Sequence, residues 1–102
     1  MRIDYERTGG FAGMRLATTI DTTTLPADQA GTLHSLIDEA HFFDLPAKIP
    51  APPNVADQFN YRVTVEAQSK KHTVDVSETS ASPALQALLQ QLTLLARSTR
   101  SP

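Results

Sequence analysis

Hydrophobic and polar residues alternate in four separate stretches of the chain, and this period of two predicts four β-strands. In the first stretch, Ile3 and Tyr5 point one way and charged residues point the other. The four stretches are residues 2–7, 14–20, 58–67 and 72–78. We therefore expect two β-hairpins, the first closed by a glycine-rich turn and the second by the residues QSKK.

Two further stretches carry apolar residues at spacings of three and four, which indicates amphipathic helices. Pro26 suits the first turn of one helix and Pro46 prevents its continuation, while Ser82 offers an N-cap and Pro83 a first helical position for the other. The predicted apolar faces are Leu33, Leu36, Ile37 and Ala40 in the first helix, and Leu85, Leu88, Leu89, Leu92, Leu95 and Ala96 in the second. We expect Phe42 and Phe43 to pack the first helix end into the core.

The order of these elements is β-β-α-β-β-α, which predicts a single α+β domain over residues 1–102. We expect a four-stranded antiparallel sheet with both helices on one face. Residues 46–56 hold four of the seven prolines and predict a surface loop without regular structure. The other sheet face is expected to be solvated and to carry cross-strand polar pairs among Asp4, Glu6, Arg15, Thr19, Arg62, Thr64, Glu66, Thr73 and Asp75.

Charge and cysteine content narrow the classes of function. The chain has a formal net charge of −2 and no cysteine. Mild acidity argues against nucleic-acid and membrane partners, which need clustered Lys and Arg. The absence of cysteine excludes a disulfide and a thiol nucleophile. No signal segment or membrane-length apolar run is visible, so we expect a cytoplasmic protein, with the mature form of a secreted protein as the alternative. We also expect a monomer.

No set of residues fills the roles of nucleophile, base and orienting group, and we therefore expect no enzyme and no cofactor. His34, Asp38 and His41 share one side of the first predicted helix, an arrangement that two interpretations fit. They form either a zinc site that lacks a fourth ligand or a solvent-exposed side of the helix next to its apolar face. We expect no metal. His72 is expected to be partly buried and hydrogen-bonded to a neighbour.

The GGFAG run precedes a strand, so it is not a phosphate loop.

The turn of the first hairpin is the best candidate for a binding surface. Residues 7–14 read RTGGFAGM, which sets one large aromatic side chain, Phe11, among glycines. Phe11 either folds back to cap its own sheet or is presented as an anchor for a partner. The candidate partner-binding residues are Thr8, Gly9, Gly10, Phe11, Ala12, Gly13 and Met14.

An ordered series of motifs resembles the emfourin family, bacterial protein inhibitors of thermolysin-like zinc metallopeptidases such as protealysin. The series begins with RTGGFAG after the first strand, followed by a threonine-rich strand and LP. It continues with FFDLPA, QFNYRVTVE, HTVDVSE and a final leucine-rich helix, and it covers nearly the whole chain.

This resemblance implies a non-enzymatic inhibitor whose partner is a protealysin-type peptidase. Such enzymes have a zinc ion at the floor of a cleft and an apolar pocket beside it. The implied mode is occlusion of the cleft by the hairpin tip, with Phe11 or Met14 near the apolar pocket. The proline-rich residues 46–56 add a second contact if they lie at the same end of the domain. The alternative is a non-enzymatic interaction domain with an unrelated partner.

Overall fold

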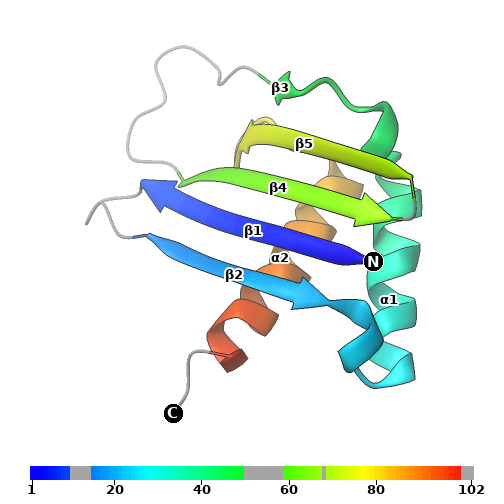
Figure 1. Cartoon of the computed structure of the whole chain (residues 1–102). Helices are drawn as coiled ribbons and strands as arrows, with labels where there is room; N and C mark the ends of the chain where they lie inside the picture. The colour runs from blue at the N-terminus through cyan, green and yellow to red at the C-terminus, as the bar shows by residue number, and fades with distance from the viewer. Residues whose placement is uncertain (10–14, 50–58, 68, 100–102) are drawn as a thin grey trace.

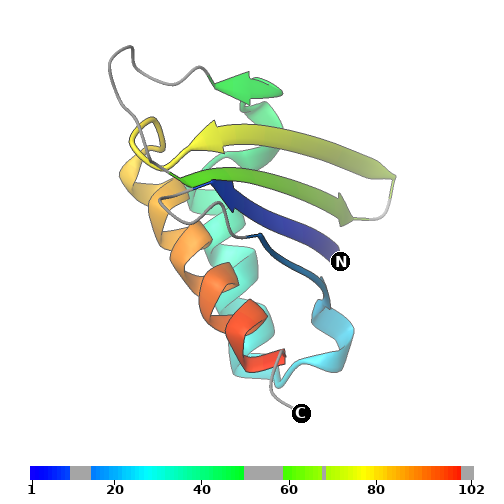
Figure 2. The ribbon, with the colours of Figure 1, turned by 90° about the vertical axis from the view of Figure 1, so that its left-hand side faces the viewer.

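Five strands form one mixed sheet, and two helices cover one of its faces (Figures 1 and 2). The computed structural model of the chain describes residues 1–9, 15–49, 59–67 and 69–99. The strands lie in the order β2-β1-β4-β5-β3. Their bounds are β1 Arg2–Gly9, β2 Leu16–Asp21, β3 Lys48–Ile49, β4 Phe59–Ala67 and β5 Lys70–Ser77, and the helices are α1 Ala27–Glu39 and α2 Pro83–Thr99. Two short 3-10 helices, η1 Thr22–Thr24 and η2 Phe42–Asp44, flank α1.

The expected four-stranded, purely antiparallel sheet is wrong because β3 adds a fifth strand. The four strands of the two predicted hairpins are antiparallel as expected, but β3 runs parallel to β5. Lys48 lies opposite Asp75, and the Asp75 N–H donates to the Ala47 carbonyl oxygen over 2.8 Å. The expectation of no regular structure in residues 46–56 is therefore wrong at this point. A two-residue strand has no alternation to reveal it, since its pairing depends on the edge that β5 supplies.

The core lies between the sheet and the helices, as the alternation predicts. Ile3, Tyr5, Val63 and Val65 are buried on the sheet side. Leu33, Ile37, Leu85, Leu88, Leu89, Leu92 and Ala96 are buried on the helix side, with Ala40 and Phe42 at the end of α1. Phe42 meets the Phe43 ring edge to face at 5.8 Å between centroids. The predicted packing of the first helix end into the core is thus confirmed.

The two helix starts lie at the predicted signals, whereas α1 ends before the predicted stop at Pro46. The Leu85 N–H donates to the Ser82 Oγ over 3.2 Å, which confirms the N-cap of α2. Pro26 directly precedes Ala27, and Pro46 follows the end of η2. The end of α1 was not predicted: His41 has φ 51°, the left-handed conformation that normally favours glycine. This residue turns the chain sharply from α1 into η2.

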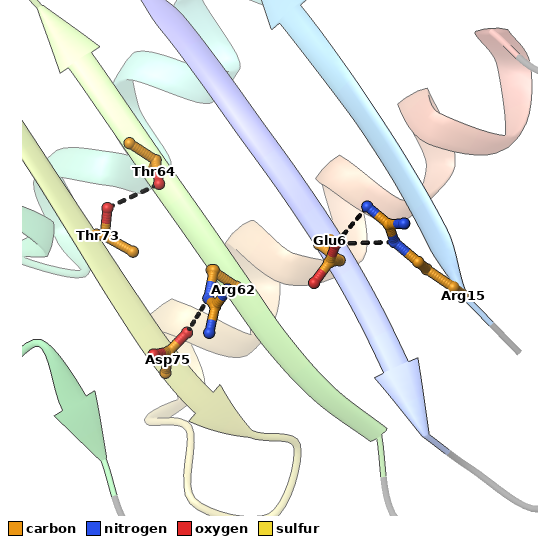
Figure 3. A network of polar contacts seen from close by, with 6 residues as sticks. All are labelled: Glu6, Arg15, Arg62, Thr64, Thr73 and Asp75. Atoms are coloured by element: carbon orange, nitrogen blue, oxygen red, sulfur yellow. Dashed lines mark hydrogen bonds and ion pairs between the residues drawn. The ribbon is translucent and has the colours of Figure 1, made fainter. Parts of the chain in front are cut away.

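Cross-strand polar pairs cover the sheet face opposite the helices (Figure 3). The Arg62 Nε donates to Asp75 Oδ1 over 2.7 Å, and the Arg15 Nε donates to Glu6 Oε2 over 2.8 Å. The Thr64 and Thr73 hydroxyls are 2.8 Å apart. The predicted solvated face is therefore confirmed, and its charges are largely satisfied by one another. No helix in the described part of the chain is long and apolar enough to cross a membrane.

Candidate functional site

The base of the predicted binding tip is a paired end of the sheet. Thr8 and Gly9 are the last residues of β1 and lie opposite Asn60 and Phe59 of β4. Gly9 has φ 91°, which a residue with a side chain rarely adopts. The remaining predicted residues, Gly10, Phe11, Ala12, Gly13 and Met14, lie outside the described residues. The two interpretations of Phe11 both stand.

The residues that flank the proline-rich segment lie at the same end of the sheet as the base of the tip. Ile49 pairs with Val76 near the end of β5, and Phe59 pairs with Gly9 at the end of β1. β2 begins at this end too, because Leu16 lies opposite Arg7. Residues 10–14 and 50–58 are therefore both bounded by described residues at one end of the sheet. The residues that flank the proline-rich segment therefore lie at the same end of the domain as the base of the hairpin tip, which is the arrangement that a second contact requires.

A groove of about 610 Å³ opens next to this end, on the side of the sheet that carries the helices. Its walls come from the last part of β1, the start of β4, the residues after β5, and the exposed side of α2. Leu94 of α2 lines the groove and is 59% exposed, a large hydrophobic side chain in contact with solvent. The lining residues are Arg7, Tyr61, Glu78, Thr79, Gln86, Leu89, Gln90, Thr93, Leu94 and Arg97.

Arg7 is held in the groove by aromatic neighbours. Its guanidinium carbon lies 4.2 Å from the centre of the Phe59 ring. Burial raises the pKa of Tyr61, while the positive charge of Arg7 lowers it and the negative charge of Glu78 raises it. Arg7, Tyr61 and Glu78 all line the same groove.

Tyr5 joins the sheet to α2 beneath the groove. Its hydroxyl lies 2.5 Å from the Thr93 Oγ1, and its ring centre lies 6.1 Å from that of Tyr61. Burial raises the pKa of Tyr5, and the hydrogen bond to Thr93 and the charges of Arg7 and Arg97 act in the opposite direction.

The three histidines belong to no metal-binding cluster in the described part of the chain. His34 Nε2 lies 3.5 Å from the Thr22 Oγ1, and His72 Nε2 lies 2.7 Å from the Leu45 carbonyl oxygen. The prediction of a partly buried, neighbour-bonded His72 is confirmed. Over residues 1–9, 15–49, 59–67 and 69–99, no three His, Cys, Asp or Glu side chains gather closely enough to hold a metal ion.

Comparison with known proteins decides the family. The model of the family described as Emfourin matches residues 5–93. The chain belongs to the emfourin family. A solved structure of emfourin (M4in) from Serratia proteamaculans, described as an M4 family peptidase inhibitor, is 25% identical to this emfourin. That alignment covers 88% of this chain and 86% of the other, with a TM-score of 0.47. A search of curated proteins finds no match.

Sequence reasoning missed the groove of this emfourin, although one signal pointed to it. Arg7 shares its strand face with Ile3 and Tyr5, so a charged residue stands where the alternation calls for an apolar one. Such a break shows that the helix layer does not cover the end of the strand. Leu94 is the matching signal on α2, since it lies outside the buried stripe of that helix.

Proposed function

We propose that this emfourin inhibits thermolysin-like zinc metallopeptidases of the M4 family and has no catalytic step of its own. Membership of the emfourin family carries the proposal, together with the description of the Serratia member as an M4 family peptidase inhibitor. The described residues also form a groove next to the base of the hairpin tip.

The hairpin tip is the part we propose to enter the active-site cleft. The proposed contact residues remain Thr8, Gly9, Gly10, Phe11, Ala12, Gly13 and Met14. Thr8 and Gly9 are already fixed by their pairing with β4. Binding therefore loses less conformational entropy at these two residues. Residues 8–14 contain no histidine, cysteine or carboxylate. Steric occlusion, with Phe11 or Met14 in the apolar pocket, is therefore favoured over capture of the zinc ion.

The proline-rich segment is the proposed second contact. Its flanking residues, Ile49 and Phe59, lie at the same end of the sheet as Gly9. A partner that covers this end would meet both segments at once. Two linked contacts on one rigid frame reinforce each other, because the second forms at high effective concentration once the first is made.

Titration against a thermolysin-like peptidase tests the function directly. The purified chain is added to the enzyme, and hydrolysis of a peptide substrate is followed, with a serine peptidase as the control. We expect stoichiometric loss of activity for the metallopeptidase alone. An unchanged rate at micromolar inhibitor contradicts the proposal.

The role of the tip is tested by Phe11→Ala and Met14→Ala, with circular dichroism as the check on folding. An anchor side chain in a pocket is worth about 2 kcal/mol of binding free energy or more, which corresponds to a rise of roughly thirtyfold in the inhibition constant. If both folded variants inhibit as the wild type does, the tip is not the anchor. A lower melting temperature for Phe11→Ala with unchanged inhibition shows instead that Phe11 caps its own sheet.

A further inference from the structure

The arginines of the described chain fall into two groups. Those on the sheet face opposite the helices are all paired with carboxylates: Arg2 with Asp4 at 3.5 Å, Arg15 with Glu6 at 2.7 Å, and Arg62 with Asp75 at 2.7 Å. The two arginines that line the groove, Arg7 and Arg97, form no ion pair with any described residue. Arg7 lies over the Phe59 ring, but no described carboxylate is within 4 Å of either guanidinium.

The acidic residue of the groove, Glu78, is hydrogen-bonded to the backbone. Glu78 Oε1 accepts a hydrogen bond from the Phe59 N–H over 3.1 Å, which turns this carboxylate toward the start of β4. The lining residues therefore present two cations against one anion. Arg7 stands on β1 and Arg97 in the last turn of α2, so the positive charges come from two walls of the groove.

Apolar surface lies beside these charges. Leu94 is three residues before Arg97, so the two side chains emerge on neighbouring positions of α2. Leu94 is 59% exposed, whereas Leu89 forms part of the buried stripe below it. Arginine and exposed apolar side chains together are the composition of binding hot spots.

We infer that this groove receives an acidic segment of the target peptidase, with a carboxylate between Arg7 and Arg97 and an apolar side chain against Leu94. This inference rests on the proposed function and adds a docking surface that is separate from the hairpin tip. The groove lies at the end of the sheet where Gly9 and Phe59 pair, so one partner can reach both surfaces. Guanidinium groups bind carboxylates through paired, charge-assisted hydrogen bonds, which fixes the orientation of the partner.

The test compares two arginine-to-glutamine substitutions that change the net charge equally. Arg97→Gln removes a groove cation, and Arg2→Gln, at the start of β1, removes a cation from the opposite face. Inhibition constants are measured against one thermolysin-like peptidase in 0.05 M and 1 M NaCl. We expect about a tenfold rise for Arg97→Gln at low salt, a much smaller one at high salt, and wild-type inhibition for Arg2→Gln.

Glu78→Gln makes the charge of the groove more positive, whereas Arg97→Gln makes it less positive. The glutamine side-chain oxygen still accepts from the Phe59 N–H, but the negative charge of the groove is removed. We expect this variant to inhibit more tightly than the wild type at low salt. Leu94→Ala is expected to weaken inhibition in both salt concentrations, since an apolar contact is not screened.

Each result decides the inference separately from the inhibitory function. If the wild type inhibits but Arg97→Gln behaves as Arg2→Gln does, the groove is not a docking site and the proposed function stands. An effect of Arg97→Gln that is equally large in 1 M NaCl also overturns the charge argument, as does weaker inhibition by Glu78→Gln. If the wild type fails to inhibit, the proposed function fails first.

Discussion

Glu78 and Phe59 are joined by two hydrogen bonds that run in opposite directions. The Glu78 N–H donates to the Phe59 carbonyl oxygen over 3.0 Å, and the Phe59 N–H donates to the Glu78 Oε1 over 3.1 Å. Phe59 also carries the Arg7 guanidinium on its ring. Glu78 therefore fixes the first residue of β4 and, through it, one wall of the groove.

Replacing Glu78 with alanine leaves the Phe59 N–H without its side-chain acceptor. We expect Glu78→Ala to lower the free energy of unfolding by about 1 kcal/mol, the usual net value of one hydrogen bond. Glu78→Gln keeps an acceptor oxygen and is expected to lose clearly less. Urea unfolding followed by circular dichroism measures both. Equal destabilisation of the two variants would show that charge, and not the hydrogen bond, is what matters at this position.

Gly31 lies inside α1, where glycine weakens a helix through its backbone entropy. A Cβ atom built at this position meets nothing within 4 Å. We therefore expect Gly31→Ala to raise the free energy of unfolding by about 1 kcal/mol. Gly31→Ser, with an intermediate helix propensity, should raise it by a smaller amount. Thermal unfolding gives the order, and a melting temperature for Gly31→Ala below that of the wild type would refute the open-space argument.

Tyr5 makes stability depend on pH in the alkaline range. Burial raises its pKa above the ordinary value of 10.0. The unfolded state therefore ionises first, and stability falls as the pH rises from about 10 through the folded-state pKa. Tyr5→Phe lacks the hydroxyl, so its alkaline loss of stability should be shallower, at the cost of the hydrogen bond to Thr93 at neutral pH. Urea unfolding between pH 8 and 11 tests this, and identical alkaline slopes for the two proteins would contradict it.

The fold could be predicted wherever the local sequence pattern favours the same secondary structure that the tertiary packing requires. Ile3 and Tyr5 alternate with charged residues because one face of β1 is buried, and the Ser82-Pro83 pair starts α2 through local bonding alone. β3 could not be predicted, since its pairing at Lys48 and Ile49 depends on the distant edge of β5. The left-handed turn at His41 was missed because its sequence shows no glycine there.

The candidate site was predicted only in part, for a related reason. The glycine-rich run predicts a hairpin tip by composition, and of its residues the structure describes Thr8 and Gly9, which pair with β4. The groove combines residues from β1, β4 and α2. Arg7 and Arg97 are ninety positions apart in the sequence, and only the packing of α2 against the sheet brings them to one groove.

Gly9, Arg15, Ile49 and Phe59 all lie at one end of the sheet, and they bound residues 10–14 and 50–58. The N-terminus lies at the opposite end, as do Ala67 of β4 and Lys70 of β5, which pair with each other. Lengthening a segment between fixed ends adds only slowly to its closure entropy. A change in the length of residues 10–14 or 50–58 is therefore expected to alter the closure entropy only slightly. We therefore propose that exchanging these two segments on the same sheet would retarget inhibition from one peptidase to another.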